Sequence, residues 1–342
     1  MRPLLGTTLA ELEASFTGEG IPRFRAAQVM QRVYRRGATS FPEMSDLPGP
    51  LRATLAGAWQ VDPLAVRQLQ KSSDGTMKFL FELEDKETLE SVLIPAKDRW
   101  TLCVSTQVGC AVRCGFCASG LKGLTRNLTP AEMVGQVVRA NRELGKGKLT
   151  NVVFMGMGEP FHNYANVLKA LDILIAPWGF ALGQRHITVS TSGVPDAIRK
   201  FAKDAGQIRL AISLHAPNDA LRDKLVPLNK RYPLTELLEA VKDYQEASHR
   251  QVMWEYVLLK GVNDSLDQAR ELAELVGSFR GRINLIPFNL VTETGFKGPA
   301  EERVLAFQGV LRRCGALVTL RRERGQDIAA ACGQLRFQQS PG

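Results

Sequence analysis

Histidine is scarce in this chain: there are four among 342 residues, and none lies close in sequence to the cysteine loop described below. Zinc sites in proteins are usually closed by four cysteine or histidine ligands. The scarcity of histidine therefore weighs against a zinc site completed by a neighbouring imidazole.

Long apolar segments are also missing. No apolar run is long enough to span a membrane, so we expect no membrane partner. The first residues, MRPLLGTTLAELEASF, carry acidic side chains and have no long apolar core, unlike a signal peptide. We therefore expect the chain in the cytoplasm, where thiols stay reduced, and do not expect its six cysteines to form a disulfide framework.

Acidic residues are fewer than basic ones, with 35 Asp and Glu against 44 Lys and Arg. The chain therefore has a net charge of +9 and an isoelectric point near 9.4. A basic surplus favours a polyanionic partner such as RNA. The run IPRFRAAQVMQRVYRRG predicts a basic helix with five arginines, which is either an RNA-binding face or an ordinary solvated face. These arginines are Arg23, Arg25, Arg32, Arg35 and Arg36.

Three cysteines with the spacing CxxxCxxC are the most informative feature that is present. Cys110, Cys114 and Cys117 lie in the run CVSTQVGCAVRCGFCASGLKGL. A [4Fe–4S] cluster usually takes four thiolates, so three on one loop leave one iron free to bind S-adenosylmethionine (SAM). Such a cluster can reduce SAM to a 5′-deoxyadenosyl radical. A zinc loop and simple packing of buried cysteines are the alternatives.

The hydrophobic pattern predicts three parts. Residues 1–65 read as a small helical domain, and residues 66–98 as a β-hairpin linker. Residues 99–342 alternate strands and helices, which predicts an α/β fold with a parallel sheet. Six strand–helix units are fewer than the eight of a closed barrel, so we expect a partial (β/α)6 barrel that is open on one side.

Polar and glycine-rich motifs follow the predicted strands. Because active sites of such barrels form at the carboxyl ends of the strands, these motifs are expected to converge. They are the cysteine loop, the GMGEP run at residues 156–160, Ser190 with Thr191, residues 213–215 (SLH), and Asn289.

The chain resembles one radical-SAM family nearly end to end. The strings CVSTQVGCAVRCGFCAS, NVVFMGMGEP, LAISLHAPND, INLIPFN and GQDIAAACGQLR are similar to the RlmN/Cfr group, adenine-C2 methyltransferases of large-subunit rRNA and tRNA. The resemblance implies a radical-SAM barrel, a [4Fe–4S] cluster and two SAM molecules per turnover. It also implies that the helical N-terminal domain binds RNA.

The same resemblance assigns roles to individual residues. Cys332 would carry the methyl group, Cys103 would resolve the adduct by forming a disulfide with Cys332, and Glu90 would accept a proton. Cys110, Cys114 and Cys117 would hold the cluster. SAM would be bound by Gly158, Glu159, Ser190, Ser213, Leu214, His215 and Asn289.

The resemblance implies 23S rRNA at the peptidyl transferase centre as substrate, together with the anticodon loop of tRNA. It further implies an electron donor such as flavodoxin or ferredoxin. Three alternatives stay open: a sister enzyme that methylates adenine C8 and confers antibiotic resistance, a radical-SAM enzyme acting on a small molecule, and a zinc-containing RNA-binding protein without catalysis.

Overall fold

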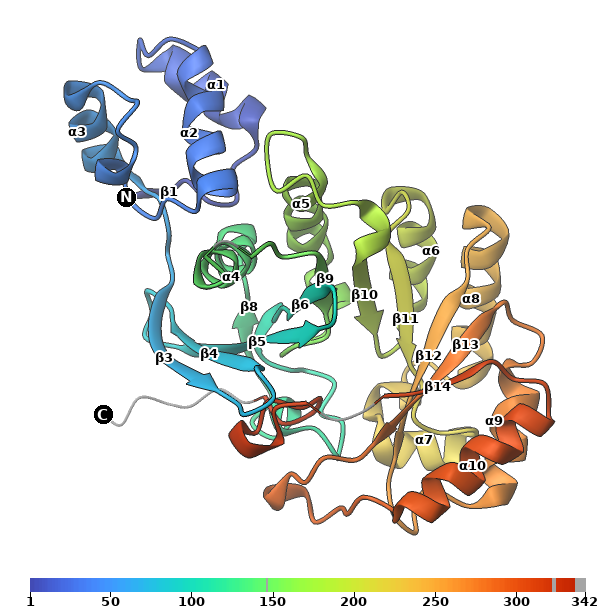
Figure 1. The fold of residues 1–342 in the computed structure, drawn as a ribbon. Helices are drawn as coiled ribbons and strands as arrows, with labels where there is room; N and C mark the ends of the chain where they lie inside the picture. The colour runs from blue at the N-terminus through green and yellow to red at the C-terminus, as the bar shows by residue number, and fades with distance from the viewer. Residues whose placement is uncertain (146, 322–323, 336–342) are drawn as a thin grey trace.

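The computed structural model describes residues 1–145, 147–321 and 324–335. Residues 1–60 form a helical module at one end of the molecule (Figure 1). A short parallel pair, β1 (Arg2–Pro3) with β2 (Trp59–Gln60), closes the module by joining its two ends. Its helices are α1 (Leu9–Gly18), α2 (Phe24–Arg36) and α3 (Gly49–Ala58), with the 3-10 turn η1 (Phe41–Glu43) before α3.

Local sequence explains where these helices begin and end. Thr8 caps α1 with its hydroxyl, and Glu11 completes the capping box. Helix α2 ends at Gly37, whose φ of 69° suits glycine. Tyr34 of α2 packs on Trp178 and Phe180, which anchors the module on the loop after α5 (Tyr164–Ile175).

The remaining chain builds one ten-stranded sheet, in the order β14-β13-β12-β11-β10-β9-β6-β5-β4-β3. The strands from β6 to β14 are parallel, and the three at the β3 end are antiparallel. Their bounds are β3 Ala65–Lys71, β4 Met77–Glu82, β5 Thr88–Ala96, β6 Arg99–Cys103, β9 Asn151–Phe154, β10 Ile187–Thr191, β11 Arg209–Ser213, β12 Val252–Leu258, β13 Gly281–Pro287 and β14 Val318–Leu320.

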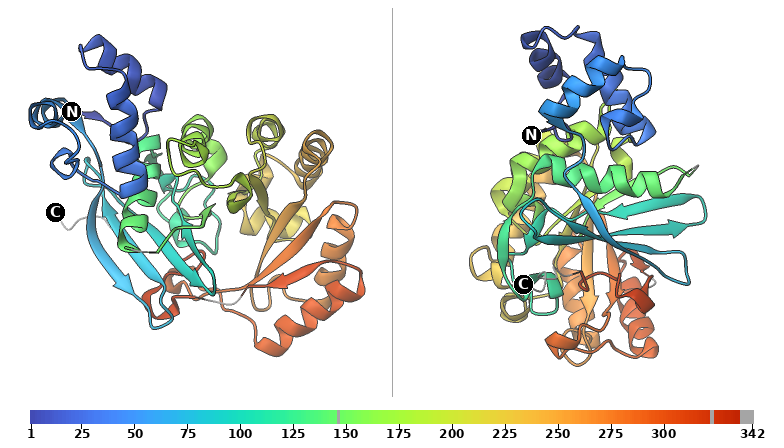
Figure 2. Two further views of the ribbon diagram at one scale, coloured as in Figure 1. Left: turned by 45° about the horizontal axis from the view of Figure 1, so that its top comes forward. Right: turned by 90° about the vertical axis from the view of Figure 1, so that its left-hand side faces the viewer.

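Helices follow the parallel strands and cover the outer face of the curved sheet, as Figure 2 shows. This arrangement is the expected partial barrel. The helices are α4 (Pro130–Glu143), α5 (Tyr164–Ile175), α6 (Pro195–Asp204), α7 (Asp219–Leu225), α8 (Leu234–Ser248), α9 (Leu266–Val276) and α10 (Glu301–Arg313). Short 3-10 turns are η2 (Ala118–Gly120), η3 (Pro160–Asn163), η4 (Gln184–His186), η5 (Pro227–Lys230), η6 (Thr292–Thr294) and η7 (Gln326–Ile328).

The predicted hairpin is confirmed, and it is continuous with the barrel. Strands β4 and β5 turn at Asp85 and Lys86, and β5 pairs with β6, the first barrel strand. The hairpin strands β4 and β5 thus extend the barrel sheet in antiparallel fashion.

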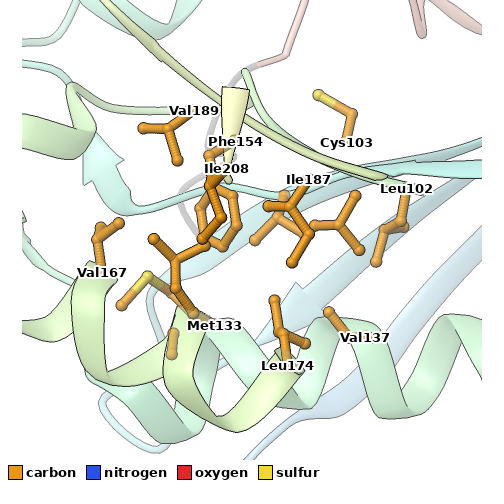
Figure 3. Close-up of a cluster of buried hydrophobic side chains, with 14 of the residues drawn as sticks. Leu102, Cys103, Met133, Val137, Phe154, Val167, Leu174, Ile187, Val189 and Ile208 are labelled. Carbon is orange, nitrogen blue, oxygen red and sulfur yellow. The ribbon is translucent and has the colours of Figure 1, made fainter. Parts of the chain in front are cut away.

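The main core lies between the sheet and its helices. Figure 3 shows Met133 and Val137 of α4 in the same cluster of buried side chains as Leu102 of β6. Cys103 follows Leu102, and successive strand residues point to opposite faces, so its thiol points away from the helices. The thiol is therefore directed to the inner, concave side of the sheet. None of the helices in the described residues has the length and apolar character needed to cross a membrane.

Candidate functional site

The cysteine motif forms a loop bracketed by two short antiparallel strands, β7 (Gln107–Gly109) and β8 (Leu124–Asn127). The amide of Cys110 donates to the carbonyl of Gly123 at 2.9 Å, which closes the base of the loop. Gly109 has a φ of +76°, and a Cβ there would lie 1.9 Å from that carbonyl oxygen. Only glycine therefore permits this closure.

The three thiols pack against an apolar cluster that includes Val112, Phe116 and Val257. Burial raises the pKa of Cys110 to about 12 and that of Cys114 well above its ordinary value. Iron binds thiolates, so loading of the cluster must displace these protons. An apolar shell of this kind also protects a reduced cluster from water.

The donor set fits a [4Fe–4S] cluster with one iron left open. All three thiols line a single pocket. Among the described residues, no three His, Cys, Asp or Glu side chains are arranged to hold one metal ion. Thiolates of a cube bind different iron atoms and need not converge on one point, so the two observations agree.

The GMGEP run lies beside this loop. Gly158 has a φ of +104°, and a Cβ there would lie 2.6 Å from the Cβ of Gln107. The Gln107 side chain accepts a hydrogen bond from the amide of Glu159 at 2.8 Å. The carboxylate of Glu159 accepts from the amides of Phe161 and Ser192, at 3.1 and 2.7 Å. It is thereby fixed in the pocket, in position to bind an ammonium group.

The third and fourth barrel strands place their ends against the same pocket. Ser190 and Ser213 lie side by side, with their hydroxyl oxygens 3.1 Å apart. His215 accepts a hydrogen bond from the amide of Val257 through Nδ1. Burial lowers the pKa of His215 to about 3, so its imidazole is neutral at pH 7. Leu214 is fully buried in the core and does not line the pocket.

Asn289 brings a buried polar atom to the pocket. Its side chain is buried, and its Oδ1 atom has no hydrogen-bond partner among the residues that the structure describes. A buried polar atom without a partner is costly, and a bound ligand is a common reason for one to persist. A SAM molecule bound across Glu159 and Asn289 would satisfy it, so the residues present fit this cofactor.

Cys332 reaches the same pocket from the far end of the chain. The carbonyl of the next residue, Gly333, accepts from the amide of Ala118, which directly follows Cys117 of the cluster loop. Cys103 is buried nearby, and this burial raises the pKa of its thiol to about 12. The nearby Cys332 raises that pKa further, and the positive charge of Arg321 lowers it in part. Both thiols are free in the structure.

Glu90 stands apart from the pocket residues. It lies on β5, is 2% exposed, and pairs with Lys78 of β4 at 3.2 Å. It does not line the cavity that holds the cluster cysteines. Of the thirteen residues predicted for the site, Glu90, Cys103 and Leu214 are those outside the pocket lining.

Three charged residues at the site escaped the sequence analysis. Glu255 of β12 and Arg321 line the pocket, and Asn284 donates to Glu255 at 2.8 Å. Arg222 of α7 lies beneath the cluster loop and donates to the carbonyls of Ser192 and Leu214. A charge within an apolar strand, as in VMWEYVLL, was the available signal for Glu255.

The basic helix is less available to RNA than its sequence indicates. Arg23 pairs with Glu13, and Arg32 pairs with Asp46 at 2.6 Å. Arg35 is exposed but donates to the carbonyl of Pro177. Much of the arginine row thus stabilises the module and its contact with the barrel.

Comparisons with known proteins agree with this geometry. Residues 104–276 match the Radical SAM superfamily, and residues 3–61 match the ribosomal RNA large subunit methyltransferase N-terminal domain. The fold and the three-cysteine pocket therefore define a radical SAM protein. The protein uses a [4Fe–4S] cluster and SAM, as predicted.

Full-length relatives narrow the assignment. A dual-specificity RNA methyltransferase RlmN of Anaeromyxobacter is 47% identical over 98% of this chain and 90% of its own. A probable dual-specificity RNA methyltransferase RlmN of Thermotoga is 45% identical over 98% of each chain. A crystal structure of a radical SAM methyltransferase from Sphaerobacter thermophilus has a TM-score of 0.96 at 47% identity, covering 98% of this chain and 99% of that one. The chain belongs to the RlmN family.

Proposed function

We propose that the protein methylates C2 of a specific adenine in 23S rRNA at the peptidyl transferase centre, and of adenine in tRNA anticodon loops. The relatives named RNA methyltransferases support the RNA substrate. The observation that carries the mechanism is the position of Cys332, which lines one pocket together with the three cluster cysteines and Glu159.

Adenine C2 is an electron-poor carbon that does not attack a SAM methyl group directly, so a carrier is needed. Cys332, as a thiolate, takes the methyl group from one SAM. When bound, the cluster and a second SAM supply a radical that removes a hydrogen atom from this methyl group. The resulting carbon radical forms a bond to C2 of adenine. The adduct regains its aromatic ring by losing the C2 proton and one electron, for which the [4Fe–4S] cluster would be the acceptor, and the base is then joined to Cys332 through a thioether.

Two further residues complete the proposed turnover. Glu90 accepts the proton that leaves C2 of the ring. The thiolate of Cys103 attacks the sulfur of Cys332, so that an S–S bond forms and the S–C bond breaks. The released carbon takes a proton and becomes the methyl group.

We assign residues 1–65 to an N-terminal domain that contains the helical module, residues 66–98 to the hairpin that carries Glu90, and residues 99–342 to the catalytic barrel. The N-terminal domain is proposed to recognise RNA. The target adenine must leave its stack to reach the pocket. Such an enzyme acts in the cytoplasm and receives electrons from a flavodoxin or ferredoxin.

The test is a set of three cysteine variants in anaerobic, cluster-reconstituted enzyme. C332A should retain its iron but form neither methylated RNA nor an RNA adduct. C103A should accumulate a protein–RNA crosslink that survives denaturation, because no second thiolate resolves the thioether. C314A is the matched control, since Cys314 is exposed at the end of α10 and lies outside the pocket.

Denaturing gels and nucleoside mass analysis give the result. Methylation at C8 instead of C2 would assign the chain to the sister activity. A C103A enzyme that turns over at the rate of C314A and leaves no crosslink would refute the resolving role of Cys103.

A further inference from the structure

Lys78 is a buried lysine that the proposed function does not use. It lies in β4 with 10% of its side chain exposed, directly before the buried residues Phe79 and Leu80. Lysine is seldom buried to this extent unless its charge is paired. The ammonium group of Lys78 therefore needs charged or polar partners among the residues around it.

The ammonium group of Lys78 has two contacts from different parts of the chain. It lies 3.2 Å from Oε1 of Glu90 and donates to the carbonyl of Ala329 at 3.4 Å. Strand register places Lys78 opposite Val92 and Leu80 opposite Glu90, so lysine and glutamate are diagonal neighbours on one face of the sheet.

Ala329 belongs to the segment that carries the methyl-accepting cysteine. We call residues 324–335 the carrier segment. Figure 1 shows this stretch, in red, beside the β3–β5 extension. Ala329 lies three residues before Cys332, and its φ of 49° marks a sharp turn there. Lys78 thus connects the carboxylate on the sheet to the carrier segment above it.

Other hydrogen bonds fix the same segment at both ends. The amide of Gly325 donates to Asp74, and Asp327 accepts from the amide of Ser73, each at 3.1 Å. At the other end, Ser119 of the cluster-loop turn donates to the carbonyl of Leu335 at 2.6 Å. The carrier segment therefore runs from the hairpin to the cluster loop, and Lys78 holds it between these two anchors.

A carboxylate as buried as Glu90 is stable in its charged form only beside a cation. A proton acceptor must be charged before it acts, and it must face the adduct on Cys332. We propose that Lys78 is a positioning residue that keeps Glu90 charged and fixes it relative to the carrier segment. This inference rests on the proposed roles of Glu90 and Cys332.

The test compares K78M, K78R and E90Q with the control K71M. Lys71 lies on the neighbouring strand β3 and forms an exposed pair with Glu143 at 2.8 Å. We expect K78M to lower kcat for RNA methylation at least tenfold, while iron content and KM for SAM stay within twofold. K78R should recover most of the rate because it restores the charge, and K71M should match wild type.

The double variant K78M/E90Q separates positioning from general stability. If Lys78 acts through Glu90, the double variant should lose no more activity than E90Q alone. Losses that multiply, an unimpaired E90Q, or a K78R that is no better than K78M would each overturn the proposal.

Amide hydrogen exchange of the carrier segment is a second readout that does not require RNA chemistry. Exchange in residues 329–335 should rise at least tenfold in K78M and stay unchanged in K71M. Unchanged exchange in K78M would refute the contact with the carrier segment. A wild-type enzyme that makes no methyladenine would instead refute the proposed function, and this exchange result would still decide the structural role of Lys78.

Discussion

The substitution G158A tests whether the backbone of the GMGEP run builds the SAM site. Gly158 has a φ of +104°, where side chains are strained, and an added Cβ would lie 2.6 Å from Cβ and 2.8 Å from the backbone nitrogen of Gln107. Gln107 cannot move freely, because it belongs to β7 and accepts from the amide of Glu159. The added methyl group must therefore displace Glu159.

The expected cost has two parts. An unfavourable positive φ costs about 1–3 kcal/mol, and overpacking against a fixed neighbour costs about 1–3 kcal/mol more. If the loop relieves the overlap by moving Glu159, SAM binding should lose at least about 1.4 kcal/mol, which is a tenfold weaker Kd.

Titration calorimetry with SAM and urea unfolding of the cluster-loaded protein measure these effects. G57A is the matched control, because Gly57 lies within helix α3 and a Cβ there meets no atom within 4 Å. It should leave SAM binding unchanged and stabilise the helix by about 0.5–1 kcal/mol. A G158A protein that binds SAM within twofold of wild type would refute this account of the loop.

Two further predictions concern the cluster and its surroundings. C114A should lose iron and all 5′-deoxyadenosine formation, because two thiolates do not hold the cube; iron and sulfide assays check this, and stoichiometric cluster in C114A would contradict it. The pKa of His215 is about 3 in the fold against 6.5 unfolded. Its contribution to stability is therefore complete above pH 6.5 and is lost as the pH falls toward 3. Urea midpoints at pH 7.5 and 5.5 should differ less in H215N than in wild type.

The sequence predicted the barrel strands because each is an apolar run followed by an amphipathic helix. It missed β3, whose residues AVRQLQK are mostly exposed and lack clear alternation. It also missed β14, which has three residues, and α7, which has seven. Short or solvent-exposed elements are stabilised by neighbouring strands and helices. The local hydrophobic pattern does not reveal these neighbours, so it does not predict such elements.

For the functional site too, residues in local motifs could be predicted from the sequence, and residues placed by tertiary contacts could not. Residues in distinctive motifs, such as Cys110 and Glu159, line one pocket, as the pattern of motifs after the strands had led us to expect. Lys78 was missed because only the folded structure shows that its charge is buried, whereas Glu255 was missed although a charge within the apolar run VMWEYVLL was a usable signal. Arg32 was placed on a helix face that was either RNA-binding or simply solvated, but its salt bridge to Asp46 depends on a tertiary contact that spacing does not encode.

The pairing of β5 with β6 has a consequence for dividing the protein. Strand β6 contacts β5 on one side and β9 on the other, so the hairpin covers what would otherwise be the open edge of the barrel. Unpaired edges invite intermolecular strand pairing. A catalytic core trimmed to begin at residue 104 would remove β6 and expose β9, a buried apolar strand. The start of the Radical SAM match at residue 104 is therefore a poor choice for the first residue of a truncated protein. A fragment that begins before β3 keeps this edge of the sheet covered.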